Sequence, residues 1–92
     1  MATARHARTS APPHIVRDPR ICGGEPTVGG TRIPVRAIVV SNRFFQDQRR
    51  VQQAYPRLNP AAIDVALAYY AEHREEIDRL IEENEQAILA AD

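Results

Sequence analysis

A short segment, residues 14–35, holds all four glycines of this chain, its only cysteine and three of its seven prolines. Glycine accepts backbone angles that other residues avoid, and proline fixes φ, so a segment this rich in both cannot be a regular helix or strand. Gly29 and Gly30 separate the β-prone runs 26–28 and 31–33, which predicts a tight two-residue hairpin between them. We therefore expect a turn-rich β-arm at the front of the chain.

Two helices are predicted to follow the arm. Pro34 suits the first helical position, and Val35, Ile38 and Val39 then follow at helical spacing, so the first helix is expected to end near residues 44–45. Asp47 is placed to cap a short second helix through residue 54, where the next residue precedes a proline and so avoids the α region.

The third helix is expected to begin at Asn59 as its N-cap and Pro60 in its first turn. Three helices with a short middle one indicate a helix-turn-helix unit. The fold class that we predict is mainly α: a trihelical helix-turn-helix with an N-terminal β-hairpin arm and an extended C-terminal helix. We divide the chain into a disordered basic tail (1–13), the arm with the trihelical domain (14–73) and an acidic amphipathic helix (74–92).

A heptad seam runs along the third helix. Eight positions are separated alternately by four and three residues: Ile63, Leu67, Tyr70, Arg74, Ile77, Ile81, Asn84 and Ile88. Six of them are apolar, and the exceptions are Arg74 and Asn84. This spacing predicts a seam that packs along another helix. A helix over residues 60–90 is about 45 Å long, at about 1.5 Å per residue, which exceeds what a small core covers. Beyond His73 it is expected to project, to fold back after a break or to lie on a partner.

The charge of the chain is zero overall but sharply divided. Residues 1–60 carry ten arginines and three acids, a net charge of +7, whereas residues 61–92 carry two arginines and nine acids, a net charge of −7. Such a division favours two surfaces with different partners, a polyanion for the first half among them. The alternative is that the two halves attract each other across a dimer.

Several chemistries are excluded or disfavoured. The chain has no lysine, so the glycine spacing at residues 24–31 lacks the lysine of a phosphate loop, and a Schiff base is excluded. The three histidines show no ligand spacing, one cysteine fits a reducing cytoplasm, and no apolar run reaches a membrane span. Cys22, His14 and Asp18 lie close in sequence, but a domain this small offers no useful pocket. We expect no enzyme, no metal and no cofactor.

The sequence resembles domain-of-unknown-function family 433. The resemblance rests on the run from His14 to Val35, on the Tyr55-Pro56-Arg57-Leu58 step and on residues 63–70, and it covers about residues 14–73. It implies a homeodomain-like trihelical domain behind a β-arm. It further implies a bacterial antitoxin of a type II toxin–antitoxin pair, acting in the cytoplasm on a PIN-like ribonuclease toxin. Positions that are commonly acidic on the second helix in the family are Arg49 and Arg50 here.

Operator DNA is the expected partner of the first half. Arginine forks onto phosphates and guanine edges, and seven residues are candidates to contact DNA: Arg32, Arg36, Arg43, Arg49, Arg50, Arg57 and Asn59. The third helix carries no arginine, asparagine or glutamine between its first turn and His73. Contacts with the phosphate backbone are therefore expected to dominate over base reading.

The C-terminal helix is the expected toxin-binding element. An arginine on it can pair with the carboxylates of a metal-dependent nuclease, and apolar residues supply the buried area of a helix-in-groove contact. The candidate residues are Arg74, Ile77, Arg79, Leu80, Ile81, Ile88 and Leu89. The protein is expected to be a homodimer. The alternative function is a dimerisation or scaffold module that binds no DNA, with the heptad seam joining two copies.

Overall fold

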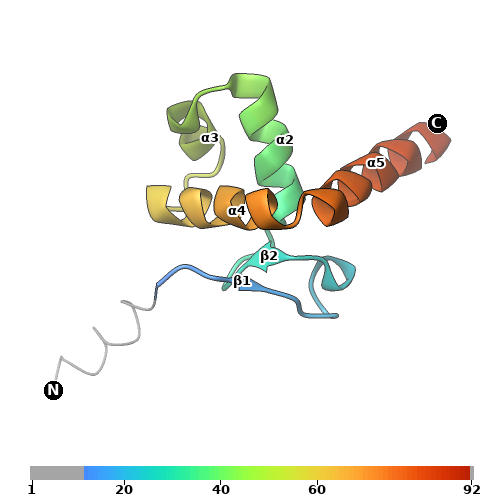
Figure 1. The fold of residues 1–92 in the computed structure, drawn as a ribbon, viewed down its shortest axis with the longest axis horizontal. Coiled ribbons are helices and arrows are strands. Elements are labelled where there is room, and N and C mark those ends of the chain that lie inside the picture. The colour runs from blue at the N-terminus through green and yellow to red at the C-terminus, as the bar shows by residue number, and fades with distance from the viewer. Residues whose placement is uncertain (1–11, 92) are drawn as a thin grey trace, which may run out of the picture.

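The computed structural model describes residues 12–91, so the predicted disordered tail lies outside the described residues except for Pro12 and Pro13. Along the chain follow β1 (Ile15–Val16), a 3-10 turn η1 (Cys22–Gly24), β2 (Thr27–Val28), α2 (Val35–Phe45), α3 (Gln48–Ala54), α4 (Pro60–Glu72) and α5 (Arg74–Ala91). Figure 1 shows the two strands beneath the helices, with α2 between α3 and α5. The prediction of a mainly α fold with an N-terminal β-arm is confirmed.

The arm pairs differently from the prediction. β1 and β2 are antiparallel, with Ile15 opposite Val28 and Val16 opposite Thr27, so the strand that forms the ladder with β2 is the earlier one. The predicted return of the chain after the glycines is present in part, because the Val28 amide donates to the Ile33 carbonyl and Thr27 forms an isolated bridge with Pro34. The chain does turn at the glycines, where the Thr31 amide donates to the Val28 carbonyl. Only Gly30 has a positive φ there, 78°. The turns that favour tight hairpins need a positive φ at the first central residue, Gly29, and the run after the turn therefore forms no strand.

The helix boundaries follow the predicted caps. The Asp47 carboxylate accepts a hydrogen bond from the Arg49 amide at 2.9 Å, and the Asn59 side chain accepts one from the Ala62 amide at 2.8 Å. Pro34 is the N-cap of α2, so that helix begins one residue later than expected. The Asp47 and Asn59 side chains each satisfy an amide that a helix start leaves without a partner, so local sequence fixes the starts of α3 and α4.

The core is built around α2, which packs against α3, α4 and α5. Its members are apolar and almost fully buried: Val28, Val35, Ile38, Val39, Val51, Leu58, Ala62, Ile63, Ala66, Ile77 and Ile81. The helix-turn-helix predicted from the short middle helix is formed by α3 and α4. Two of the core members, Ile77 and Ile81, come from α5 and lie beyond the predicted domain boundary at residue 73.

Of the three courses expected for the chain beyond His73, the structure shows a break, at His73 itself. This residue has φ −135° and ψ 43°, its ring stacks on Tyr69 with 3.9 Å between centroids, and its amide donates to the Tyr70 carbonyl. The bend brings Ile77 and Ile81 onto the core, with 0% and 6% of their surfaces exposed. The heptad seam is therefore filled largely within this chain, and burial of the two isoleucines outweighs the helical propensity of the segment.

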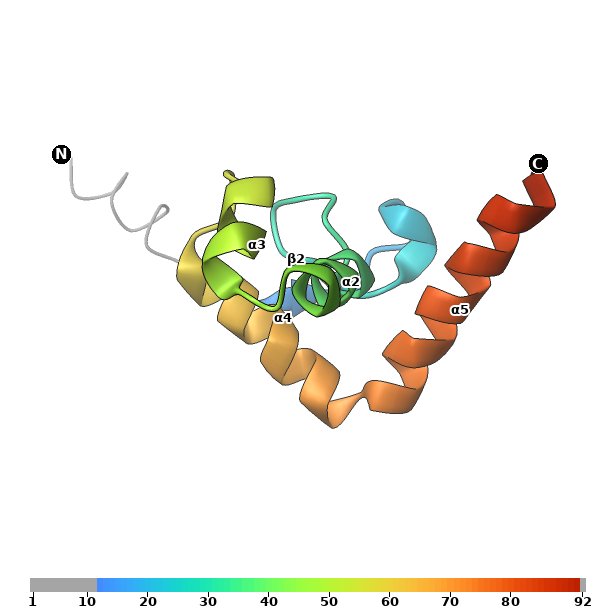
Figure 2. The same cartoon turned by 90° about the horizontal axis from the view of Figure 1, so that it is seen from above.

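The last part of α5 leaves the body of the molecule. Every residue from 82 to 90 is exposed, and Figure 2 shows this end of α5 diverging from α2 and α4. In both views α3 and the C-terminal end of α5 lie on opposite sides of α2. Within residues 12–91, the structure contains no helix with the length and hydropathy needed to span a membrane.

Candidate functional site

The exposed end of α5, residues 82–90, is the first candidate surface, and we call it the α5 tail. It extends the apolar stripe of Ile77 and Ile81 beyond the core to Ile88 and Leu89, which are 59% and 72% exposed. Glu85 joins these two residues around a shallow hollow. Glu82 and Glu83 add negative charge, and the tail carries no basic residue. It is therefore an acidic helix with an uncovered apolar face.

Two ion pairs fix the direction of α5. Arg17 on the arm donates to both oxygens of Glu76, with Nη2 2.7 Å from Oε1, and it also donates to the Tyr69 hydroxyl. The hydrogen bond from Arg17 lowers the pKa of the Glu76 carboxyl below its usual value. These contacts tie the start of α5 to the arm and to α4, so the direction of the tail follows from the fold.

The second pair joins α5 to α2. Arg43 donates to Asp78 at 2.8 Å and to the Tyr70 hydroxyl at 2.7 Å, and that hydroxyl in turn donates to Asp78. The hydrogen bond from Tyr70, followed by that from Arg43, lowers the pKa of the Asp78 carboxyl. Arg43 was predicted to contact DNA, and here it is engaged within the molecule.

The predicted toxin-binding residues fall into two groups. Ile77 and Ile81 lie in the core and Leu80 is half-buried, so these three stabilise the monomer. Arg74, Arg79, Ile88 and Leu89 are exposed, although the Arg74 guanidinium lies 5.5 Å from the centre of the Tyr70 ring. In the monomer, Ile88 and Leu89 are therefore accessible to a partner, whereas Ile77 and Ile81 are buried in the core.

The predicted DNA-contacting residues divide in the same way. Arg36 forms an ion pair with Glu25 at 3.0 Å, and the two side chains are only 20% and 15% exposed. The Asn59 oxygen is occupied as the cap of α4. Four of the predicted DNA-contacting arginines have exposed side chains that make no hydrogen bond or ion pair within residues 12–91: Arg32, Arg49, Arg50 and Arg57.

The fold brings two of these four arginines together. Arg32, from the loop after β2, and Arg57, from the turn between α3 and α4, line one cleft with Ile21 and Ile33. Arg49 and Arg50 lie in the first turn of α3. Positive charge is thus available on both sides of the turn that leads into α4, where helix-turn-helix proteins meet the phosphate backbone.

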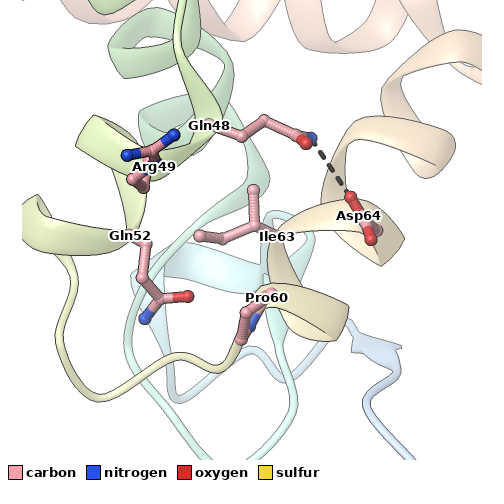
Figure 3. A pocket seen from close by; sticks show the side chains of 6 residues that line it. All are labelled: Gln48, Arg49, Gln52, Pro60, Ile63 and Asp64. Atoms are coloured by element: carbon pink, nitrogen blue, oxygen red, sulfur yellow. Dashed lines mark hydrogen bonds between the residues drawn. The ribbon is translucent and has the colours of Figure 1, made fainter.

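A groove between α3 and α4 was not predicted from the sequence. It encloses about 230 Å³ and is lined by Gln48, Arg49, Gln52, Pro60, Ile63 and Asp64, and we call it the α3–α4 groove. Figure 3 shows Ile63 at its centre and the hydrogen bond from Gln48 to Asp64 at its edge. Gln52 donates to the Leu58 carbonyl, and its buried Oε1 has no hydrogen-bond partner in the described part of the chain.

The residues considered for catalysis are each engaged elsewhere. The Cys22 thiol donates to the Arg32 carbonyl, His14 Nδ1 contacts the Pro12 carbonyl, and Asp18 pairs with Arg20. Between residues 12 and 91, no three histidine, cysteine or acidic side chains are grouped closely enough to hold a metal.

Two other exposed apolar residues were not identified from the sequence, because their spacing fits a helix whichever face is buried. Val40 and Phe44 lie one turn apart on α2 and are 42% and 80% exposed. Periodicity places them on a helix but does not tell which face the core covers. Nothing in the sequence indicated Gln52, because its unpaired oxygen results from the way its side chain packs on the turn between α3 and α4.

Comparisons with known proteins identify a family and a similar solved structure. Residues 15–70 match a family model described as "Protein of unknown function (DUF433)". A similar solved structure is the crystal structure of a DUF433 member protein from Anabaena variabilis ATCC 29413, at 30% identity and a TM-score of 0.68. The match covers 88% of this chain and 78% of that one. A search of curated proteins found no match.

Proposed function

The chain belongs to the DUF433 family, and we propose that it is the antitoxin of a type II toxin–antitoxin pair that neutralises a PIN-like ribonuclease and binds its own operator. One observation carries the proposal: the α5 tail leaves the core with Ile88 and Leu89 uncovered. Contiguous exposed apolar surface marks an interaction site more often than singly scattered apolar residues do. Helix-in-groove binding uses such a stripe as its anchor.

The chemistry of the tail refines the expected contact with the nuclease. Arg74 and Arg79 were candidates to enter a carboxylate-lined metal centre, but neither lies in the tail. The charges of the tail are Glu82, Glu83 and Glu85, which suit a basic surface such as one that binds RNA. The proposed contact is therefore made by aliphatic anchors and carboxylates, with Arg74 and Arg79 closer to the body.

Co-purification tests the nuclease partner. The reading frame next to this gene is expected to encode a PIN-like nuclease, which is co-expressed with a tag on the nuclease. The wild-type chain is expected to be retained on the nuclease, and the Ile88→Asp, Leu89→Asp double variant is expected to be lost. Glu75→Gln, an exposed change near the start of α5, serves as the control. Equal retention of the double variant and the wild type contradicts the proposal.

Operator binding is proposed for Arg32, Arg49, Arg50 and Arg57, which are exposed and unpaired within residues 12–91. Replacing Arg57 with Gln is expected to weaken binding to the DNA upstream of the gene by a similar factor for all sequences. It is also expected to reduce the slope of log affinity against log salt by about one. Fluorescence anisotropy over a salt series measures both quantities.

The result for DNA also decides the alternative function. Binding that is negligible at low salt, or that does not change with salt, contradicts operator recognition. In that case the protein functions as a dimerisation module that binds no DNA, and the α5 tail is its contact surface. Arg36→Gln is an unsuitable control here, because Arg36 is held by Glu25 and its loss disturbs the fold.

A further inference from the structure

We propose that two copies of this chain associate reciprocally, the α5 tail of each occupying the α3–α4 groove of the other. This contact does not rest on the proposed function, because it involves only the chain itself. The contact would account for two features of the monomer: the exposed aliphatic residues at the end of α5 and the groove between α3 and α4.

The groove has the size and lining that an aliphatic side chain needs. Its volume of about 230 Å³ exceeds the roughly 150 Å³ that suffices to hold a benzene-sized group. Pro60 is exposed and supplies apolar surface, while Ile63, which is 1% exposed, lies at the base of the groove between the two helices (Figure 3). Ile88 and Leu89, adjacent on the tail, are side chains of the right kind to fill it.

The charges around the two surfaces are complementary. Arg49 lines the groove and Arg50 follows it on α3, both exposed, while the tail carries Glu82, Glu83 and Glu85. Glu85 shares the hollow of Ile88 and Leu89, so inserting these residues brings Glu85 to the groove edge, where Arg49 lies. Asp64 on the opposite edge repels a carboxylate and therefore favours the orientation in which Glu85 faces Arg49.

The groove also contains a buried oxygen, Gln52 Oε1, that accepts no hydrogen bond within residues 12–91. An unpaired buried acceptor carries a desolvation cost that a donor from an occupant removes. Asn84 lies one turn before Ile88 on the tail, and its side-chain amide supplies such a donor.

The occupant must be a second molecule. Figures 1 and 2 both place α3 and the end of α5 on opposite sides of α2, so a tail cannot reach the groove of its own chain. Two copies that lie antiparallel place each tail over the groove of the other. The same contact is then made twice about a two-fold axis, which closes the assembly at a dimer.

Charge reversal tests the contact in the purified full-length chain. Arg49→Glu puts a carboxylate near the N-terminus of α3, and Glu85→Arg puts a cation near the C-terminus of α5, and each change suits its helix dipole. Each variant alone is expected to dimerise about tenfold more weakly or worse than the wild type, since both of its contacts bring like charges together. Sedimentation equilibrium measures the association, and circular dichroism checks the fold.

Mixing the two variants gives the decisive result. In the mixed dimer, the arginine introduced at position 85 of one chain meets the glutamate introduced at position 49 of the other, and the second contact is the native pair of Glu85 with Arg49. The mixture is therefore expected to recover wild-type association for both chains. In the control, a mixture of Arg32→Glu with Glu85→Arg, the Arg32→Glu chain is expected to dimerise with itself and the Glu85→Arg chain to stay dissociated. The proposal is overturned if the wild type is monomeric, if the single variants associate as well as the wild type, or if their mixture fails to associate.

Discussion

Gln46 ends α2 in a left-handed backbone conformation, with φ 54° and ψ 33°, and its amide donates to the Asn42 carbonyl at 2.8 Å. A side chain makes this conformation costly, because its Cβ approaches the neighbouring carbonyl. Helices commonly end on glycine for this reason. In this chain the turn is made without a glycine.

Replacing Gln46 with Gly is expected to stabilise the protein by about 1 kcal/mol, because glycine adopts the left-handed conformation without strain. Urea unfolding measures the change. Gln53→Gly is the matched control: Gln53 is exposed inside α3, where glycine costs about 1 kcal/mol through its backbone entropy. A loss of stability in both variants would show that the turn at Gln46 carries no strain.

At the scale of elements, α5 depends on charged contacts with distant parts of the chain. Replacing Glu76 with Gln removes the ion pair with Arg17 and is expected to lower the free energy of unfolding by up to about 1 kcal/mol at pH 7, the range for partly exposed pairs. The exposed Glu75→Gln change is the control, and urea unfolding is again the measurement.

The effect of Glu76→Gln depends on pH in a defined direction. Arg17 lowers the pKa of Glu76 in the folded protein, so the stabilisation is complete above the usual glutamate pKa of about 4.3. It is lost as the pH falls through the lowered pKa of the folded state. The difference between wild type and variant is therefore expected to vanish once the pH is below that lowered pKa. A difference that stays constant with pH would mean that the ion pair does not stabilise α5.

These contacts also explain which elements were predictable. The boundaries of α3 and the start of α4 depend on Asp47, Asn59 and the prolines beside them, which act within a few residues. The break at His73 depends on contacts such as Arg17 with Glu76, 59 residues apart. Local sequence there is strongly helical, and only the folded core shows where α5 must turn.

The candidate site was predictable to a similar extent. Exposure of Ile88 and Leu89 followed from a helix too long for its core, whereas the use of Ile77 and Ile81 within the monomer did not. Residues 1–60 contain ten arginines, but the sequence does not show which of them form ion pairs with acidic residues. Arg36 and Arg43 are held by acids 11 and 35 residues away, and such pairings depend on tertiary structure.

At the scale of the whole molecule, the division of charge becomes a division of surfaces. The acidic tail lies at one end of the long axis, while Arg49 and Arg50 lie on α3 on the other side of α2. A second copy and a nuclease would both use the tail, so the two partners are expected to compete for it. Arg32 and Arg57 line a separate cleft and remain available to DNA in either assembly.

The central claim is that the tail acts by binding and contributes little to the fold. Its most direct test is a titration of the neighbouring-frame nuclease, followed by RNA cleavage, with the wild type and with the Ile88→Asp, Leu89→Asp variant. We expect the wild type to abolish cleavage at a fixed molar ratio, and the variant, with an unchanged free energy of unfolding, to leave cleavage intact. Equal inhibition by the two proteins, or unfolding of the variant, would contradict the account.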